Sequence, residues 1–186
     1  MKKWLFNPFT YLAGAKALLL GLTLMLVTAI GAYFGNMHFN AAIDAHFGPA
    51  QPFVIYLFEQ LIAWGCPVVI FYLMALLVSK SNFRFIDIAG TLAIARTPML
   101  LIVIIALLSK SYMQALKPGT IDNTVMVLGL VMLLPVIWMI ALMYNAFKVA
   151  VNVKGTKAII GFIVGLILAE IASILLNQVL QNYFNH

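Results

Sequence analysis

The sequence predicts an all-α integral membrane protein, built as a bundle of five transmembrane helices. Of its 186 residues, 65% are hydrophobic and only 9% are charged, whereas soluble domains are about half apolar and a quarter charged. Five apolar runs are each long enough to cross the hydrocarbon core of a bilayer, which takes about 20 residues. Short polar segments separate these runs, so residues 1–186 are expected to form a single membrane domain.

The first two predicted spans cover residues 15–33 and 53–78. The first follows the aromatic segment "WLFNPFTYL", which suits a chain entering from the membrane interface. Within that segment Asn7 is a predicted cap, and Pro8 fits the first position of a helix. The second span carries an acidic residue, Glu59, in an otherwise apolar run.

The remaining spans are predicted at residues 85–108, 124–149 and 158–180. The span at 85–108 contains both Arg96 and Pro98. Several of the five spans exceed the minimum length, which allows tilting or a proline kink.

Lysine and arginine residues predict the orientation, because these residues in short loops stay on the cytoplasmic side. Eight of them lie before the first span, in the loops after the second and fourth spans, or at the span ends next to these regions: Lys2, Lys3, Lys16, Lys80, Arg84, Lys148, Lys154 and Lys157. Only Lys110 and Lys117 lie between the third and fourth spans. The N-terminus is therefore expected in the cytoplasm and the C-terminus outside, in the cytoplasmic (inner) membrane. This bias accounts for the pI of about 9.6, so nucleic acid is not an expected partner.

Three charged residues fall deep inside predicted spans, away from the span ends. At a rise of about 1.5 Å per residue, Arg96 and Glu170 lie roughly 16 and 18 Å from the cytoplasmic ends of their helices, and Glu59 about 10 Å from the opposite end. A charge at such depth costs about 3 kcal/mol and normally pairs inside the bundle. We therefore expect Arg96 to pair with Glu170. This pair either fixes helix register, with Glu59 and Gln60 as hydrogen-bond partners, or lines a proton or substrate site together with Glu59.

A second polar cluster is predicted near the cytoplasmic surface. Arg84 and Asp87 are three residues apart on one helical face, a spacing that permits a salt bridge. Asn145 approaches the same surface from the fourth span. The cluster is expected to act as an interfacial cap.

Small residues form a stripe along the fifth span. Gly161, Gly165 and Ala169 recur at intervals of four, and such stripes allow close helix approach. The stripe predicts helix packing, within the chain or in a homodimer.

The loop after the first span contains His38, Asp44 and His46, which are residue types that bind transition metals. Their spacing in a loop is undiagnostic, so we expect ordinary interfacial polar residues and no metal. The sequence contains no HExxH or GxSxG motif, and neither an enzymatic activity nor a cofactor is expected.

The five-span layout, the entry segment "FNPFTYL" and the third-span pattern "FIDIAGTLAIARTP" resemble the Yip family. These are small five-span membrane proteins named for their interaction with Ypt/Rab GTPases. The chain looks like a bacterial-type member and lacks the Asp-Leu-Tyr-Gly-Pro motif of eukaryotic relatives. The resemblance implies a five-helix bundle in the cytoplasmic membrane.

Two functions remain open from the sequence. The first is a non-enzymatic membrane scaffold or adaptor, which binds the lipid bilayer and either a membrane-protein partner or a second copy of itself. The alternative is a small transporter or channel with a polar site lined by Glu59, Arg96 and Glu170. Water-filled space beside these residues would favour transport, and a dry, directly bonded pair would favour the scaffold.

Overall fold

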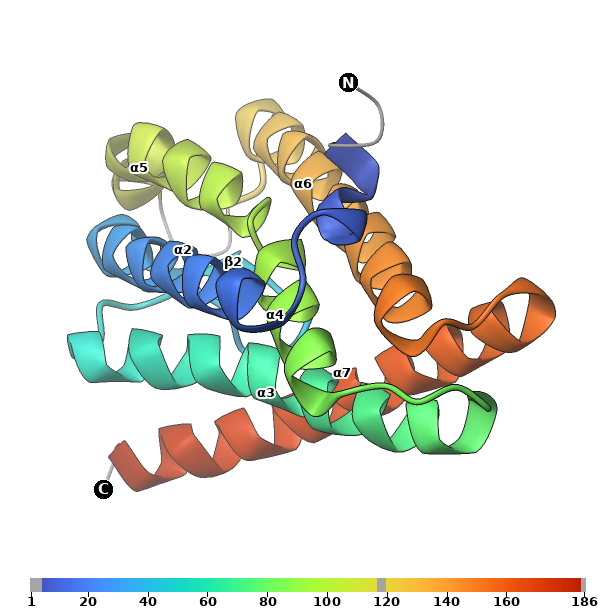
Figure 1. The fold of residues 1–186 in the computed structure, drawn as a ribbon. Coiled ribbons are helices and arrows are strands. Elements are labelled where there is room, and N and C mark those ends of the chain that lie inside the picture. The colour runs from blue at the N-terminus through green and yellow to red at the C-terminus, as the bar shows by residue number, and fades with distance from the viewer. Residues whose placement is uncertain (1–4, 117–119, 185–186) are drawn as a thin grey trace.

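The protein is an all-α bundle in a computed structural model that describes residues 5–116 and 120–184 (Figure 1). Five helical segments are long and apolar enough to cross a membrane, which confirms that prediction. The helices are η1 Pro8–Thr10, α2 Gly14–Gly35, α3 Phe53–Val78, α4 Phe85–Ala95, α5 Met99–Ala115, α6 Asn123–Val151 and α7 Gly155–Phe184. Two short strands, β1 Met37–His38 and β2 His46–Phe47, lie between α2 and α3. Lys2, Lys3 and Lys117 of the predicted charge pattern lie outside the described residues.

The third predicted span is present but consists of two helices with a break between them, at a proline for which the sequence allowed a kink. Helix α4 ends at Ala95 and α5 begins at Met99, and Figure 1 shows that the two run in different directions. Proline has no N–H to donate and disfavours helical geometry in the residue before it, so Pro98 interrupts the helix. The amide of Met99 still donates to the carbonyl of Arg96 at 2.9 Å. Arg96 therefore lies at a helix break.

Helices α2 and α4 cross at a contact that only glycine permits. A Cβ atom added to Gly21 would lie 2.4 Å from the Cβ of Ala93, and one added to Gly90 would lie 2.6 Å from the carbonyl oxygen of Gly14. Both distances are well below van der Waals contact, so the two backbones approach closely at these positions. This crossing holds the first half of the broken span against α2.

The small-residue stripe of α7 packs within the chain. A Cβ on Gly165 would lie 2.7 Å from the ring of Phe71, and one on Gly161 would lie 3.3 Å from Val78. Ala169, on the same stripe, is fully buried. Helix α7 therefore lies close along α3, and the two are neighbours in Figure 1.

The segment between α2 and α3, residues 36–52, is folded into the bundle, and we call it the α2–α3 loop. Met37, Phe39, Ala41 and Ala42 are each at most 1% exposed. Strands β1 and β2 close the loop as a short antiparallel ladder. Backbone buried at this depth needs hydrogen-bond partners from the protein itself. The polar residues of the spans supply those partners.

We predict that Gly21→Ala destabilises the protein by about 1–3 kcal/mol, because the new methyl group collides with backbone and side-chain atoms of α4. The matched control is Gly129→Ala, since a Cβ at Gly129 meets nothing within 4 Å. Thermal unfolding of the two purified variants in detergent measures the change in stability of each. Equal melting temperatures for the two variants would contradict the close α2–α4 crossing.

Candidate functional site

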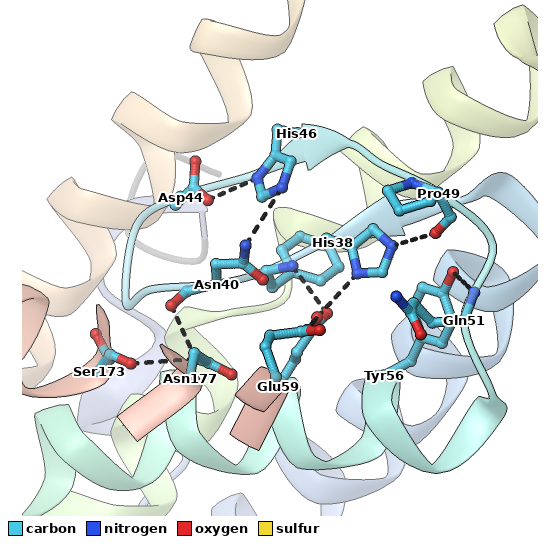
Figure 2. A network of polar contacts seen from close by, with 12 residues as sticks. His38, Asn40, Asp44, His46, Pro49, Gln51, Tyr56, Glu59, Ser173 and Asn177 are labelled. Atoms are coloured by element: carbon cyan, nitrogen blue, oxygen red, sulfur yellow. Dashed lines mark hydrogen bonds and ion pairs between the residues drawn. The ribbon is translucent and has the colours of Figure 1, made fainter. Parts of the chain in front are cut away.

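The α2–α3 loop is held by polar side chains from α3, from the α4–α5 break and from α7. The bonds to its backbone are Phe39 N to Glu59 Oε2 at 3.2 Å, Asn177 Nδ2 to Asn40 O at 2.8 Å, Ala42 N to Ser173 Oγ at 2.9 Å, Arg96 Nη1 to Ala42 O at 2.8 Å and Ile43 N to Glu170 Oε2 at 3.0 Å. Glu59, Arg96 and Glu170, the three charged residues singled out in the spans, are thus gathered around one loop. Figure 2 shows part of this network.

Arg96 points from the helix break into the bundle and is only 3% exposed. Its Nη1 donates to two carbonyl oxygens, that of Ala42 at 2.8 Å and that of Ala63 at 3.0 Å. The second carbonyl belongs to α3, four residues before Pro67. A proline cannot donate to the carbonyl four residues earlier, so that oxygen is left free for Arg96.

Arg96 and Glu170 do not form the direct ion pair that their depths suggested. Within the described residues, no ion pair joins them. Arg96 donates to the carbonyl of Ala42, and the carboxylate of Glu170 accepts from the amide of Ile43. These two groups belong to the same peptide unit, so one peptide lies between the two charges. Its dipole is aligned with them, because the C=O faces the cation and the N–H faces the anion.

Helix α7 carries a polar stripe that sequence reasoning recognised only at Glu170. Ser173, Asn177 and Gln181 follow it at helical spacing and therefore lie on the same face. Ser173 and Asn177 bind successive parts of the loop backbone, and Gln181 donates to Glu59 Oε1 at 3.2 Å. Polar residues at positions i, i+3, i+7 and i+11 of an apolar span were the signal that could have identified this face.

Glu59 is fully buried and binds His38 of the loop (Figure 2). Its Oε1 lies 2.8 Å from His38 Nδ1, and the other ring nitrogen, Nε2, lies 2.9 Å from the carbonyl oxygen of Pro49. The His38 ring also stacks on Tyr56 with 4.7 Å between ring centroids. His38 was expected to be an interfacial residue, but it is 3% exposed.

The hydrogen bonds of His38 determine its protonation. A carbonyl oxygen only accepts, so Nε2 donates to Pro49, and donation from Nδ1 to Glu59 as well makes the ring an imidazolium. Glu59 also accepts from Phe39 N and Gln181 Nε2. Burial lowers the pKa of His38, but the hydrogen bond and the charge of Glu59, with the Pro49 carbonyl, outweigh burial and raise that pKa above 6.5.

The other metal-ligand candidates bind each other. His46 Nδ1 lies 2.8 Å from Asp44 Oδ2, and His46 Nε2 lies 3.3 Å from Asn40 Nδ2. In residues 5–116 and 120–184, no group of three His, Cys, Asp or Glu side chains could hold a metal ion.

The predicted cytoplasmic cluster is divided in two. Arg84 and Asp87 form a bidentate ion pair at 2.9 and 3.0 Å. Because the Arg84 side chain is 76% exposed, this pair adds little stability. Asn145 instead donates to the carbonyl of Phe6 at 2.9 Å and ties the N-terminal segment to α6.

Several buried donors have no hydrogen-bond partner in the described part of the chain. They are Arg96 Nε, Arg96 Nη2 and Gln60 Nε2. Gln60 was expected to bond with the buried charges, so that prediction is wrong. A buried guanidinium with two free nitrogens retains the capacity to bind a further acceptor.

Comparisons of this chain with protein families, with curated proteins and with solved structures found no match.

We predict that Arg96→Gln destabilises the protein by about 3 kcal/mol, because Glu170 is left in the bundle without a countercharge. Glu170→Gln should cost about 1 kcal/mol, since the amide oxygen still accepts from Ile43. If the peptide couples the two charges, the double variant loses about 1 kcal/mol less than the sum of the single variants. Thermal and denaturant unfolding in detergent measure the free energies of unfolding of the two single variants and the double variant. If the two single losses simply add in the double variant, the peptide does not couple the two charges.

We predict that the loop is bound more firmly in acid than in alkali. The pKa of His38 is raised in the folded protein, so its stabilising effect is complete below the unfolded value of about 6.5 and is lost as pH rises through the folded value. The melting temperature should therefore fall as the pH rises above about 6.5. His38→Gln should flatten the dependence of the melting temperature on pH, whereas His46→Gln should leave that dependence unchanged. A slope that survives in His38→Gln would assign it to another group.

Proposed function

We propose that this protein is a non-enzymatic membrane scaffold of the Yip-like type, inserted in the cytoplasmic membrane with its N-terminus in the cytoplasm. One observation carries the proposal. The charged residues within the spans, Glu59, Arg96 and Glu170, bind the backbone or a side chain of the α2–α3 loop. In a scaffold such residues stabilise one shape of the bundle.

The surroundings of these charges also support a scaffold. Among the pockets of the described part of the chain, four of about 250 to 510 Å³ are lined by neither Arg96 nor Glu170. A transport pathway needs a polar cavity reaching such residues. The inserted loop occupies the space between the two charges instead.

Two loops on the side where most of the basic residues are expected are joined, which supports a single partner-binding face. Ser79, after α3, donates to the carbonyl of Val151 at the end of α6 at 2.8 Å, and Asn152 donates to Ser81 at 3.2 Å. Lys80 and Lys154 lie in these two loops. Basic loops remain cytoplasmic and attract anionic headgroups. We therefore assign binding of a membrane-protein partner to this face.

A transporter or channel is the second candidate function. The observation in its favour is the pair of unbonded nitrogens on Arg96, which would bind an anionic group if the loop withdrew. Transport would then require the loop to leave its network of hydrogen bonds.

We predict that proteoliposomes containing the purified protein show no proton, cation or chloride flux above that of empty liposomes. In cells, photo-crosslinking residues at Lys80 and Lys154 should capture the same membrane protein, and a crosslinker at Val179, exposed on α7, should not. Arg84→Gln, which removes an exposed charge, is the matched control for Arg96→Gln. Ion flux that disappears in a well-folded Arg96→Gln protein, and persists in Arg84→Gln, would replace the scaffold with a transport pathway.

A further inference from the structure

Two pockets lie along the seam between α3 and α7. The larger pocket, of about 510 Å³, includes Gly65 of α3 and Ala172 of α7 in its lining. The smaller pocket, of about 270 Å³, includes Val78 at the end of α3 and Lys157 near the start of α7. The larger pocket is therefore near the middle of these two spans, and the smaller one is at the membrane surface.

The two pockets lie on the same side of this seam, because residues spaced by four share one face of a helix. Lining residues of both pockets follow this spacing on each helix: Ile70, Met74 and Val78 on α3, and Ile160, Ala172 and Leu176 on α7. Between the pockets, Leu73 and Leu168 continue the same apolar surface and are 50% and 45% exposed. The two pockets and the surface between them form one groove, which we call the α3–α7 groove.

The two ends of the groove differ in chemistry. The larger pocket is apolar apart from the Cys66 thiol, and a Cβ on Gly65 would meet nothing within 4 Å. At the smaller pocket Thr156 and Lys157 are exposed, and neither makes a hydrogen bond or an ion pair within the described part of the chain. Among the described residues, no carboxylate lines either pocket. A cation at one end and an apolar cavity at the other complement an anionic amphiphile.

We propose that the α3–α7 groove binds one anionic phospholipid, with its phosphate at Lys157 and one acyl chain in the larger pocket. The length of the groove supports this arrangement. At a rise of about 1.5 Å per residue, Ile70 and Gly65 of the larger pocket lie about 12 and 20 Å along α3 from Val78. One leaflet of the hydrocarbon core is about 15 Å thick, so a full-length acyl chain that starts beside Val78 ends within the larger pocket.

Lys157 lies on the side that the proposed orientation places in the cytoplasm, so the lipid comes from the inner leaflet. Only this choice of leaflet rests on the proposed function. Lipid binding measured in detergent depends neither on the orientation of the protein nor on a protein partner. Failure of the lipid site and failure of the scaffold are therefore distinguishable.

The headgroup is tested by titrating dioleoyl phosphatidylglycerol and dioleoyl phosphatidylcholine into the full chain in detergent, with native mass spectrometry as the measurement. The phosphatidylglycerol has a net negative charge and should bind about fivefold more tightly, which is the contribution of one lysine at a membrane surface. Lys157→Gln should abolish this preference. Lys154→Gln is the matched control and should retain it, because Lys154 is also exposed but lies outside the pocket.

A second pair of variants tests the acyl chain. Gly65→Leu places a side chain in the larger pocket and should weaken binding of dioleoyl phosphatidylglycerol about threefold or more, because the acyl chain loses packing contacts there. The same variant should bind dioctanoyl phosphatidylglycerol as the unmodified protein does, since the shorter chain ends before the larger pocket. Gly129→Leu is the control, because a Cβ at Gly129 also meets nothing within 4 Å. Melting temperatures in detergent show that each variant is folded.

Three results would overturn the proposal. Equal binding of the two dioleoyl lipids, or an equal loss of preference in Lys157→Gln and Lys154→Gln, would show that the groove holds no specific headgroup. An equal effect of Gly65→Leu on the long and short lipids would show that no acyl chain occupies the larger pocket. A dimer in the native spectra that dissociates in Gly65→Leu, and persists in Gly129→Leu, would identify a second copy of the chain as the occupant.

Discussion

The peptide unit between Ala42 and Ile43 is the contact on which the centre of this structure depends. It accepts from Arg96 at one end and donates to Glu170 at the other, so it separates two opposite charges that would otherwise meet directly. A peptide dipole aligned between them stabilises both charges and satisfies its own polar groups at the same time. This contact requires the loop to lie inside the bundle.

The rest of the fold makes room for that loop. Backbone cannot be buried at membrane depth unless each N–H and C=O finds a partner, and here the polar stripe of α7 supplies several. The break at Pro98 frees Arg96 from a regular helix, and Pro67 leaves a carbonyl on α3 for the same guanidinium. The small side chains of Ala41 and Ala42 let the loop backbone come within hydrogen-bond distance of both helices.

The parts of this architecture that depend on length and hydropathy could be predicted from the sequence. Five apolar helices follow from what a bilayer demands, and Pro98 was a visible reason for a break. Counting residues along each helix correctly placed Arg96 and Glu170 at a similar depth in the membrane. The same calculation assumes that each span is straight and that each loop lies outside the bundle. The inserted loop was missed because its partners are backbone atoms far away in sequence, for which the local sequence contains no signal. His38 was missed as a partner of Glu59 because the loop was expected to lie outside the bundle.

The charges inside the bundle balance only when the loop is inserted. Arg96 offsets Glu170, but Glu59 is fully buried and no arginine or lysine of the described chain pairs with it. His38 supplies that positive charge, and His38 belongs to the loop. Withdrawing the loop would leave Glu59 as a lone carboxylate in an apolar bundle, a state that costs several kcal/mol unless the group takes up a proton. Loop insertion and helix packing therefore stabilise each other, and for this reason we regard the loop as a structural part of the bundle and not as a gate.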